Sequence, residues 1–67
     1  MAGISLDVLR AGKKYKLTNY GERFDFTIEE ILNNGDYKIK DIHTLETGLL
    51  LDLYRYGKGK DFEIREL

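Results

Sequence analysis

The stretch RFDFTIEEILNNGDYKIK, residues 23–40, decides the fold. Residues 24–28 alternate between apolar and polar side chains, which is the period-2 pattern of a strand with one buried face. The Asn-Gly pair within residues 33–36 supplies the positive φ values that a tight hairpin turn needs. Residues 37–40 alternate again, so they predict a second strand, antiparallel to the first.

The end of the first of these strands has two interpretations. Residues 27–30, Thr-Ile-Glu-Glu, match a capping box, which favours a short helix over 28–34. The strict alternation before this point and the hairpin turn after it favour instead a strand with a bulge near Glu29 and Glu30. We expect the bulged strand, because it lets Phe26 and Leu32 both reach the core.

Three further strands are expected around this hairpin. Residues 14–18 alternate and are bounded by glycine-containing turns. Residues 49–56 predict a strand with Leu49, Leu51 and Leu53 on one face, and residues 61–67 predict the last one.

A four-residue loop at 57–60 would join these two strands in a hairpin. That register sets Leu53 opposite Ile64, and Asp52 opposite Arg65, so that apolar residues meet on one face and opposite charges on the other.

Five short strands in a chain of 67 residues predict an all-β fold, a five-stranded small barrel. Closure would remove exposed strand edges. We expect one domain over residues 1–67, with an N-terminal arm or helical turn at 1–11 and the barrel at 12–67. Five side chains are expected to converge inside the barrel: Tyr15, Phe24, Ile39, Leu51 and Ile64.

Composition narrows the class of function. Eleven Lys and Arg residues against twelve Asp and Glu residues give a formal net charge of −1, whereas a general polyanion binder carries a positive excess. The absence of Cys excludes disulfides and Cys-based zinc sites. No apolar run approaches the roughly 20 residues of a membrane span, and the start of the chain lacks the pattern of an export signal. We therefore expect a cytoplasmic monomer or weak homodimer without cofactor, metal or membrane contact.

The opening of the predicted barrel resembles that of a known superfold. The run Leu9-x-x-Gly12-x-x-Tyr15-x-Leu17, followed by a short loop and a long second strand, is similar to many SH3-like barrels, in particular small bacterial SH3-like domains of unknown function. The resemblance implies a binding scaffold. Peptide-binding SH3 domains carry a groove Trp and a groove Pro, and this chain has neither residue, so the resemblance does not imply binding of Pro-rich ligands.

The leading candidate for a binding surface is an aromatic pair. Tyr54 and Tyr56 are predicted on the outer face of the strand 49–56, next to a glycine-rich loop, where they could contact a protein partner. An alternative is that the N-terminal arm, with Ile4 and Leu6, covers them as a second small core. The first interpretation makes the protein a non-catalytic binding or assembly module.

A second candidate function is nucleic-acid binding. It combines the two tyrosines, as stacking platforms, with cations that could meet phosphate. The cations are Arg55, Lys58, Lys60, Lys14 and Lys16. The plainer interpretation is that these lysines keep a small barrel soluble and face the acidic strand 21–32.

We do not expect an enzyme. His43 is the only histidine, and Asp41 and Thr44 beside it offer base-like groups without a nucleophile that the sequence places next to them. A single His and no Cys also argue against a structural transition-metal site. The segment Gly57-Lys58-Gly59-Lys60 lacks the spacing of a phosphate-binding loop and predicts a turn.

Overall fold

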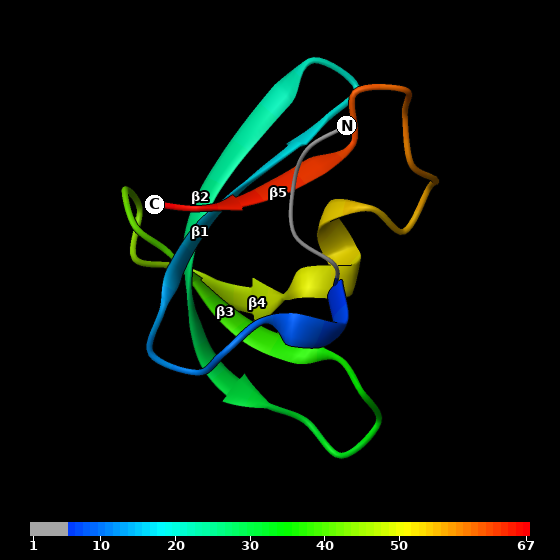
Figure 1. The fold of residues 1–67 in the computed structure, drawn as a ribbon. Helices are drawn as coiled ribbons and strands as arrows, with labels where there is room; N and C mark the ends of the chain where they lie inside the picture. The colour runs from blue at the N-terminus through cyan, green and yellow to red at the C-terminus, as the bar shows by residue number, and fades with distance from the viewer. Residues whose placement is uncertain (1–5) are drawn as a thin grey trace.

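The alternating segments form one antiparallel sheet. The structure, a computed structural model, describes residues 6–67, and the five strands follow the order β4-β3-β2-β1-β5 (Figure 1). The strands are β1 (Lys14–Asn19), β2 (Glu22–Ile31), β3 (Tyr37–Asp41), β4 (Thr47–Leu49) and β5 (Glu63–Glu66). Two 3-10 helices complete the fold, η1 (Leu6–Val8) and η2 (Leu50–Leu53). The prediction of an all-β protein is thereby confirmed.

The predicted closure of the sheet is wrong. Strand β2 is ten residues long and pairs with β1 through its first part and with β3 through its second, so it joins the two halves of the sheet (Figure 1). Strands β4 and β5 lie at the two ends of the order, and the sheet is open. The physical reason is that β4 has only three residues before the chain turns into η2, which leaves no long strand to bridge the edges.

The hairpin in the deciding stretch is confirmed, and so is its bulge. The β2–β3 register pairs Ile28 with Ile39 and then Glu30 with Lys38, so two residues of β2 stand against one of β3. The helical alternative over 28–34 is therefore wrong. The turn is closed by the N–H of Leu32, which donates to the carbonyl of Asp36, and by Gly35 with a φ of +87°.

The strand predicted over 49–56 is also wrong beyond its first residue. Residues 50–53 form η2, a tight turn that buries Leu50 completely and leaves Leu51 42% exposed. Figure 1 shows this turn, in yellow, directly after β4. The N–H of Leu51 donates to the Asp36 carboxylate, and the N–H of Tyr54 donates to the Leu51 carbonyl, which fixes the turn.

The predicted final hairpin does not form, because β5 pairs with β1. Leu17 faces Ile64 and Lys16 faces Arg65, in place of the expected pairs between 49–56 and 61–67. Residues 54–62 instead make a long connection between η2 and β5.

The core lies on the side of the sheet that η1 and η2 cover. Of the five predicted core residues, Tyr15, Ile39 and Ile64 are buried, Phe24 is partly buried, and the placement of Leu51 is wrong. The complete set of buried apolar residues is Leu9, Tyr15, Leu17, Phe26, Ile28, Tyr37, Ile39, Leu50 and Ile64.

The N-terminal segment forms the expected helical turn, η1. Leu6 packs against the core, and the Tyr37 hydroxyl donates to the Leu6 carbonyl at 2.6 Å. Ile4, which the arm hypothesis also used, lies outside the described residues. Within residues 6–67, no helix has the length and apolarity to cross a membrane.

Candidate functional site

The connection between η2 and β5 is held in place by one buried amide, Asn19. This side chain, only 4% exposed, ends β1 on its core-facing side. Its Oδ1 accepts the N–H of Gly59 at 2.7 Å, and its Nδ2 donates to the carbonyls of Gly57 at 3.1 Å and Leu53 at 3.4 Å. Two points of the connection and the end of η2 are thus tied to one strand end, which gives the connection a defined shape.

A carboxylate fixes the other end of the same connection. Asp61 accepts the backbone N–H of Tyr20 at 2.8 Å and of Gly21 at 2.7 Å, and thereby joins the connection to the β1–β2 turn. The bond from Gly21 is the main reason why the pKa of Asp61 is lowered, so the carboxylate is ionised near neutral pH. Gly59 fits tightly between these groups, because a Cβ at this position would lie 2.9 Å from the Asp61 carboxylate and 3.0 Å from the Tyr20 ring.

Three tyrosines lie around this anchored connection. Tyr54 is half-buried, with its ring edge-on to Phe62 at a centroid distance of 5.7 Å, and burial raises its pKa. Tyr56 is 91% exposed and Tyr20 is 63% exposed. They line a surface pocket of about 250 Å³, which we call the tyrosine pocket. Its lining residues are Asn19, Tyr20, Glu22, Phe24, Asp52, Leu53, Tyr54, Arg55, Tyr56 and Gly57.

A second, more apolar pocket adjoins the first. It has a volume of about 150 Å³ and lies between β2, β3, β4 and η2; we call it the Gly48 pocket. Its lining residues are Phe24, Asp25, Phe26, Ile39, Asp41, Glu46, Thr47, Gly48, Leu49, Asp52 and Leu53. Phe24, Asp52 and Leu53 line both pockets, so the two are neighbours on the surface, and we refer to the pair as the groove along η2.

The structure brings together some of the predicted site residues and separates others. Tyr54, Arg55 and Tyr56 line the tyrosine pocket. The ammonium of Lys58 lies over the rings of Tyr54 and Phe62, at 5.4 and 5.0 Å from their centroids, and Lys60 is exposed beside Asp61.

Lys14 and Lys16 lie elsewhere. They alternate along β1 with the buried Tyr15 and Leu17, so their side chains leave the sheet on the face opposite to the core. Because Tyr54 packs against the core side, β1 separates it from these two lysines. The geometry therefore does not combine all of the cations and tyrosines into one patch.

Sequence reasoning missed the residues that shape the groove. The predicted strand ends at residue 18, before Asn19, and the sequence patterns assign no part of a binding surface to Asn19, Asp61, Tyr20 or Gly48. A signal for Asn19 was available, since it follows Tyr15 and Leu17 at the next inward position of β1. A polar side chain on the buried face of a strand requires hydrogen-bond partners, which points to a contact with another segment.

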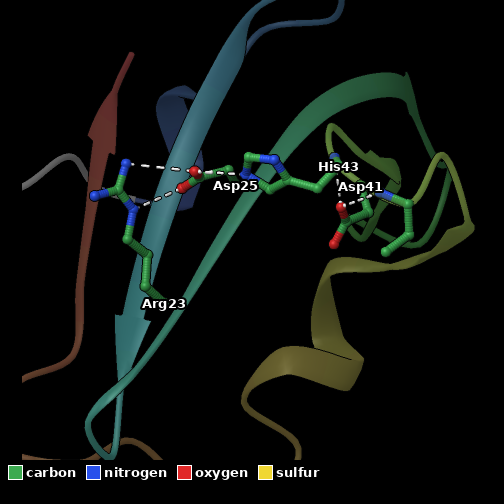
Figure 2. Close-up of polar contacts among 5 residues, drawn as sticks. Arg23, Asp25, Asp41 and His43 are labelled. Carbon is green, nitrogen blue, oxygen red and sulfur yellow. Dashed lines mark hydrogen bonds and ion pairs between the residues drawn. The ribbon is translucent and has the colours of Figure 1, made fainter.

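His43 takes part in a charged cluster on the sheet (Figure 2). Its Nε2 lies 3.0 Å from one Asp25 oxygen, while Arg23 Nε donates to the other oxygen at 2.8 Å. The bond from Arg23 is the largest cause of the lowered pKa of Asp25. Asp41 accepts the backbone N–H groups of His43 and Thr44 at 2.7 and 2.9 Å, which lowers its pKa.

This cluster fits a structural role. It connects the β3–β4 turn to β2, and no hydroxyl within the described range 6–67 is hydrogen-bonded to the imidazole. In the same range, no three His, Asp or Glu side chains are grouped so that they could hold a metal ion. Comparison with models of protein families, with curated proteins and with solved structures gives no match to this chain.

Proposed function

We propose that the protein is a non-catalytic binding module that takes an extended segment of a partner protein into the groove along η2. The observation that carries the proposal is the exposure of Tyr56 and Tyr20 on loops that Asn19 and Asp61 hold in one shape. Ordering a loop on binding costs free energy, so a loop ordered beforehand favours binding. Exposed tyrosines at the rim of a pocket are typical anchors of protein interfaces.

The dimensions of the groove support a polypeptide partner. Its pockets have volumes of about 250 and 150 Å³, below the roughly 300–1,000 Å³ of small-molecule sites. Pockets of this size suit single side chains that follow one another along an extended chain. The proposal includes a monomer or weak homodimer in the cytoplasm, as expected from the sequence.

The likeness to SH3-like domains is part of this proposal. Leu9, Tyr15 and Leu17 of the opening run are buried, and Gly12 turns the chain into β1 with a φ of +83°. The long second strand shared between two halves of the sheet also supports the likeness. The proposed binding scaffold is therefore an open five-stranded sheet whose long strand β2 pairs with both β1 and β3.

Selection of peptides tests the proposal. The immobilised protein is screened against a displayed library of random linear peptides, and the selected peptides are measured in solution for their Kd. We expect one family of related peptides, and we expect Tyr56→Ser to lower their affinity by about tenfold or more, as for an interface anchor. Lys60→Ser, on the same connection but outside the lining of the groove, is the control and should bind as the wild type does. Enrichment of no family, or equal binding by Tyr56→Ser, would overturn the proposal.

A second candidate function, nucleic-acid binding, would use the opposite face of the sheet. There Lys14, Thr27 and Lys40 face one another across three strands, and Lys16 faces Arg65. A titration with a single-stranded oligonucleotide at low salt tests it, since phosphate contacts weaken steeply as salt rises. The Lys14→Glu/Lys16→Glu double variant should lose such binding. If wild type and double variant bind equally, this second function fails.

A further inference from the structure

We propose that the Gly48 pocket receives a Lys or Arg side chain of the partner segment; this inference rests on the proposed function. The first observation is how the pocket arises. Gly48 in β4 faces Ile39 in β3, and Ile39 is buried, so the position of Gly48 lies on the core side of the sheet. A Cβ built on Gly48 would meet nothing within 4 Å. The missing side chain therefore leaves room above Ile39.

The walls of this room are apolar and its rim is acidic. Phe24, Phe26, Ile39, Leu49 and Leu53 supply the apolar walls. Four acidic residues also line the pocket, Asp25, Asp41, Glu46 and Asp52, and no Lys, Arg or His within the described part of the chain lines it. Asp25 pairs with Lys16, so its side chain leaves the sheet on the face opposite to the core, and the acidic groups of the rim are those of Asp41, Glu46 and Asp52.

The acidic lining residues differ in their freedom to bind a cation. Asp25 is held by Arg23 and His43, and Asp41 accepts two backbone N–H groups. Asp52 forms an exposed ion pair with Arg55 at 3.2 Å, and Glu46 accepts only a long bond from the Thr44 hydroxyl at 3.5 Å. Glu46 and Asp52 therefore keep the most capacity to accept new hydrogen bonds.

A Lys or Arg side chain matches this combination of groups. Its methylene stem can lie along the apolar walls while the charged end remains at the rim. There the charge forms hydrogen bonds to carboxylates, which are shorter and stronger than bonds between neutral groups. An acidic side chain would be repelled by the rim. Arg fits best, because its planar fork can bind two acceptors at once.

A small probe tests the pocket directly. Amide chemical shifts are followed by NMR while N-acetyl-arginine-N-methylamide is added, and the same titration is made with its citrulline analogue, which has nearly the same shape and no charge. We expect the arginine probe to give a saturating shift at Glu46 and Gly48, and the citrulline probe to bind several-fold more weakly. Added salt should weaken only the arginine probe.

Two variants separate the pocket from the rest of the fold. Gly48→Val fills the room and should abolish the shifts, and Thr27→Val, on the opposite face of β2, should leave them unchanged. Equal binding of the two probes, or saturating shifts in Gly48→Val, would overturn the inference.

Binding of the peptides selected from the library distinguishes a failure of the proposed binding function from a failure of the proposed cation pocket. If they depend on Tyr56 but bind Gly48→Val as tightly as the wild type, the binding module stands and the cation pocket is wrong. If the arginine probe saturates at Gly48 but no peptide depends on Tyr56, the pocket chemistry stands and the proposed function is wrong.

Discussion

The carboxylate of Asp61 accepts the backbone N–H of Gly21 at 2.7 Å, across 40 residues of sequence. This bond, with its companion from Tyr20, joins the last connection of the chain to the first hairpin turn. The tyrosine pocket lies between these two segments, so its shape depends on the same bond.

Replacing Asp61 by Asn should lower stability in a pH-dependent manner. The pKa of Asp61 is lowered in the folded protein, so its stabilisation is complete above the pKa of about 3.9 of an unfolded Asp. It is lost as the pH falls through the lowered, folded-state pKa. We therefore expect the urea midpoint of Asp61→Asn to be below that of wild type at pH 7, and the difference to disappear in acid. Glu22→Gln is the control, and a difference that persists unchanged in acid would contradict the interpretation.

Asn19→Ala should destabilise the protein by about 1–3 kcal/mol, the cost of leaving buried polar groups without partners. The substitution deprives the Gly59 N–H and the Gly57 carbonyl of their side-chain partner. Urea unfolding measures the free energy, and hydrogen exchange at Gly59 reports the local effect. Thr18→Ala, at the neighbouring position on the opposite face of β1, should change the free energy of unfolding far less. Similar losses in both variants would contradict the role of Asn19 as an anchor.

Gly59 and Gly48 should respond differently to replacement by Ala. At Gly59 the added Cβ would meet Asp61 and Tyr20 at 2.9 and 3.0 Å, so we expect a loss of about 1–3 kcal/mol, as for other overpacked sites. At Gly48 the Cβ meets nothing within 4 Å, so the variant should be about as stable as the wild type. Thermal unfolding of both variants checks the difference, and a reversed order would be incompatible with the described packing.

Leu50 and Leu51 of η2 should contribute very differently to the free energy of unfolding. Leu50→Ala should lower the free energy of unfolding by about 2–5 kcal/mol, because Leu50 is fully buried. Leu51→Ala should change it by no more than about 0.5 kcal/mol, as at other exposed positions. Where Leu50→Ala fails to fold, Leu50→Val gives the smaller measurable loss. If Leu51→Ala lowered the free energy of unfolding more than Leu50→Ala, this result would contradict η2 and support the strand predicted over 49–56.

The deciding stretch was predictable because its signals are local. Alternation in residues 24–28 and 37–40 reports which side of a strand is buried, and the Asn-Gly turn needs only its own backbone. The bulge at Glu29 was also expected from the sequence, but Leu32, which it was to bring to the core together with Phe26, lies beyond β2 and is only partly buried. Tyr54 and Tyr56 were predicted on the outer face of a strand that does not form; both line the tyrosine pocket, but Tyr54 packs against the core.

The run Leu49-Leu50-Leu51 was not predictable in this way. Three consecutive leucines fit a strand or a tight turn equally well, and the choice depends on which of them enters the core. The strand that pairs with β5 could not be predicted from local patterns either. Residues 57–60 are compatible with a hairpin loop, whereas the observed pairing of β5 with β1 joins residues more than 40 positions apart.

Local patterns in the sequence account for the all-β class and for the central hairpin, since both follow from side-chain period or turn chemistry over a few neighbouring residues. Only the tertiary structure decided that the sheet stays open, that Leu50 enters the core and that Asn19, Asp61 and Gly48 shape a groove. The physical reason is that these features depend on hydrogen bonds and packing between distant segments, whose energies no local pattern records.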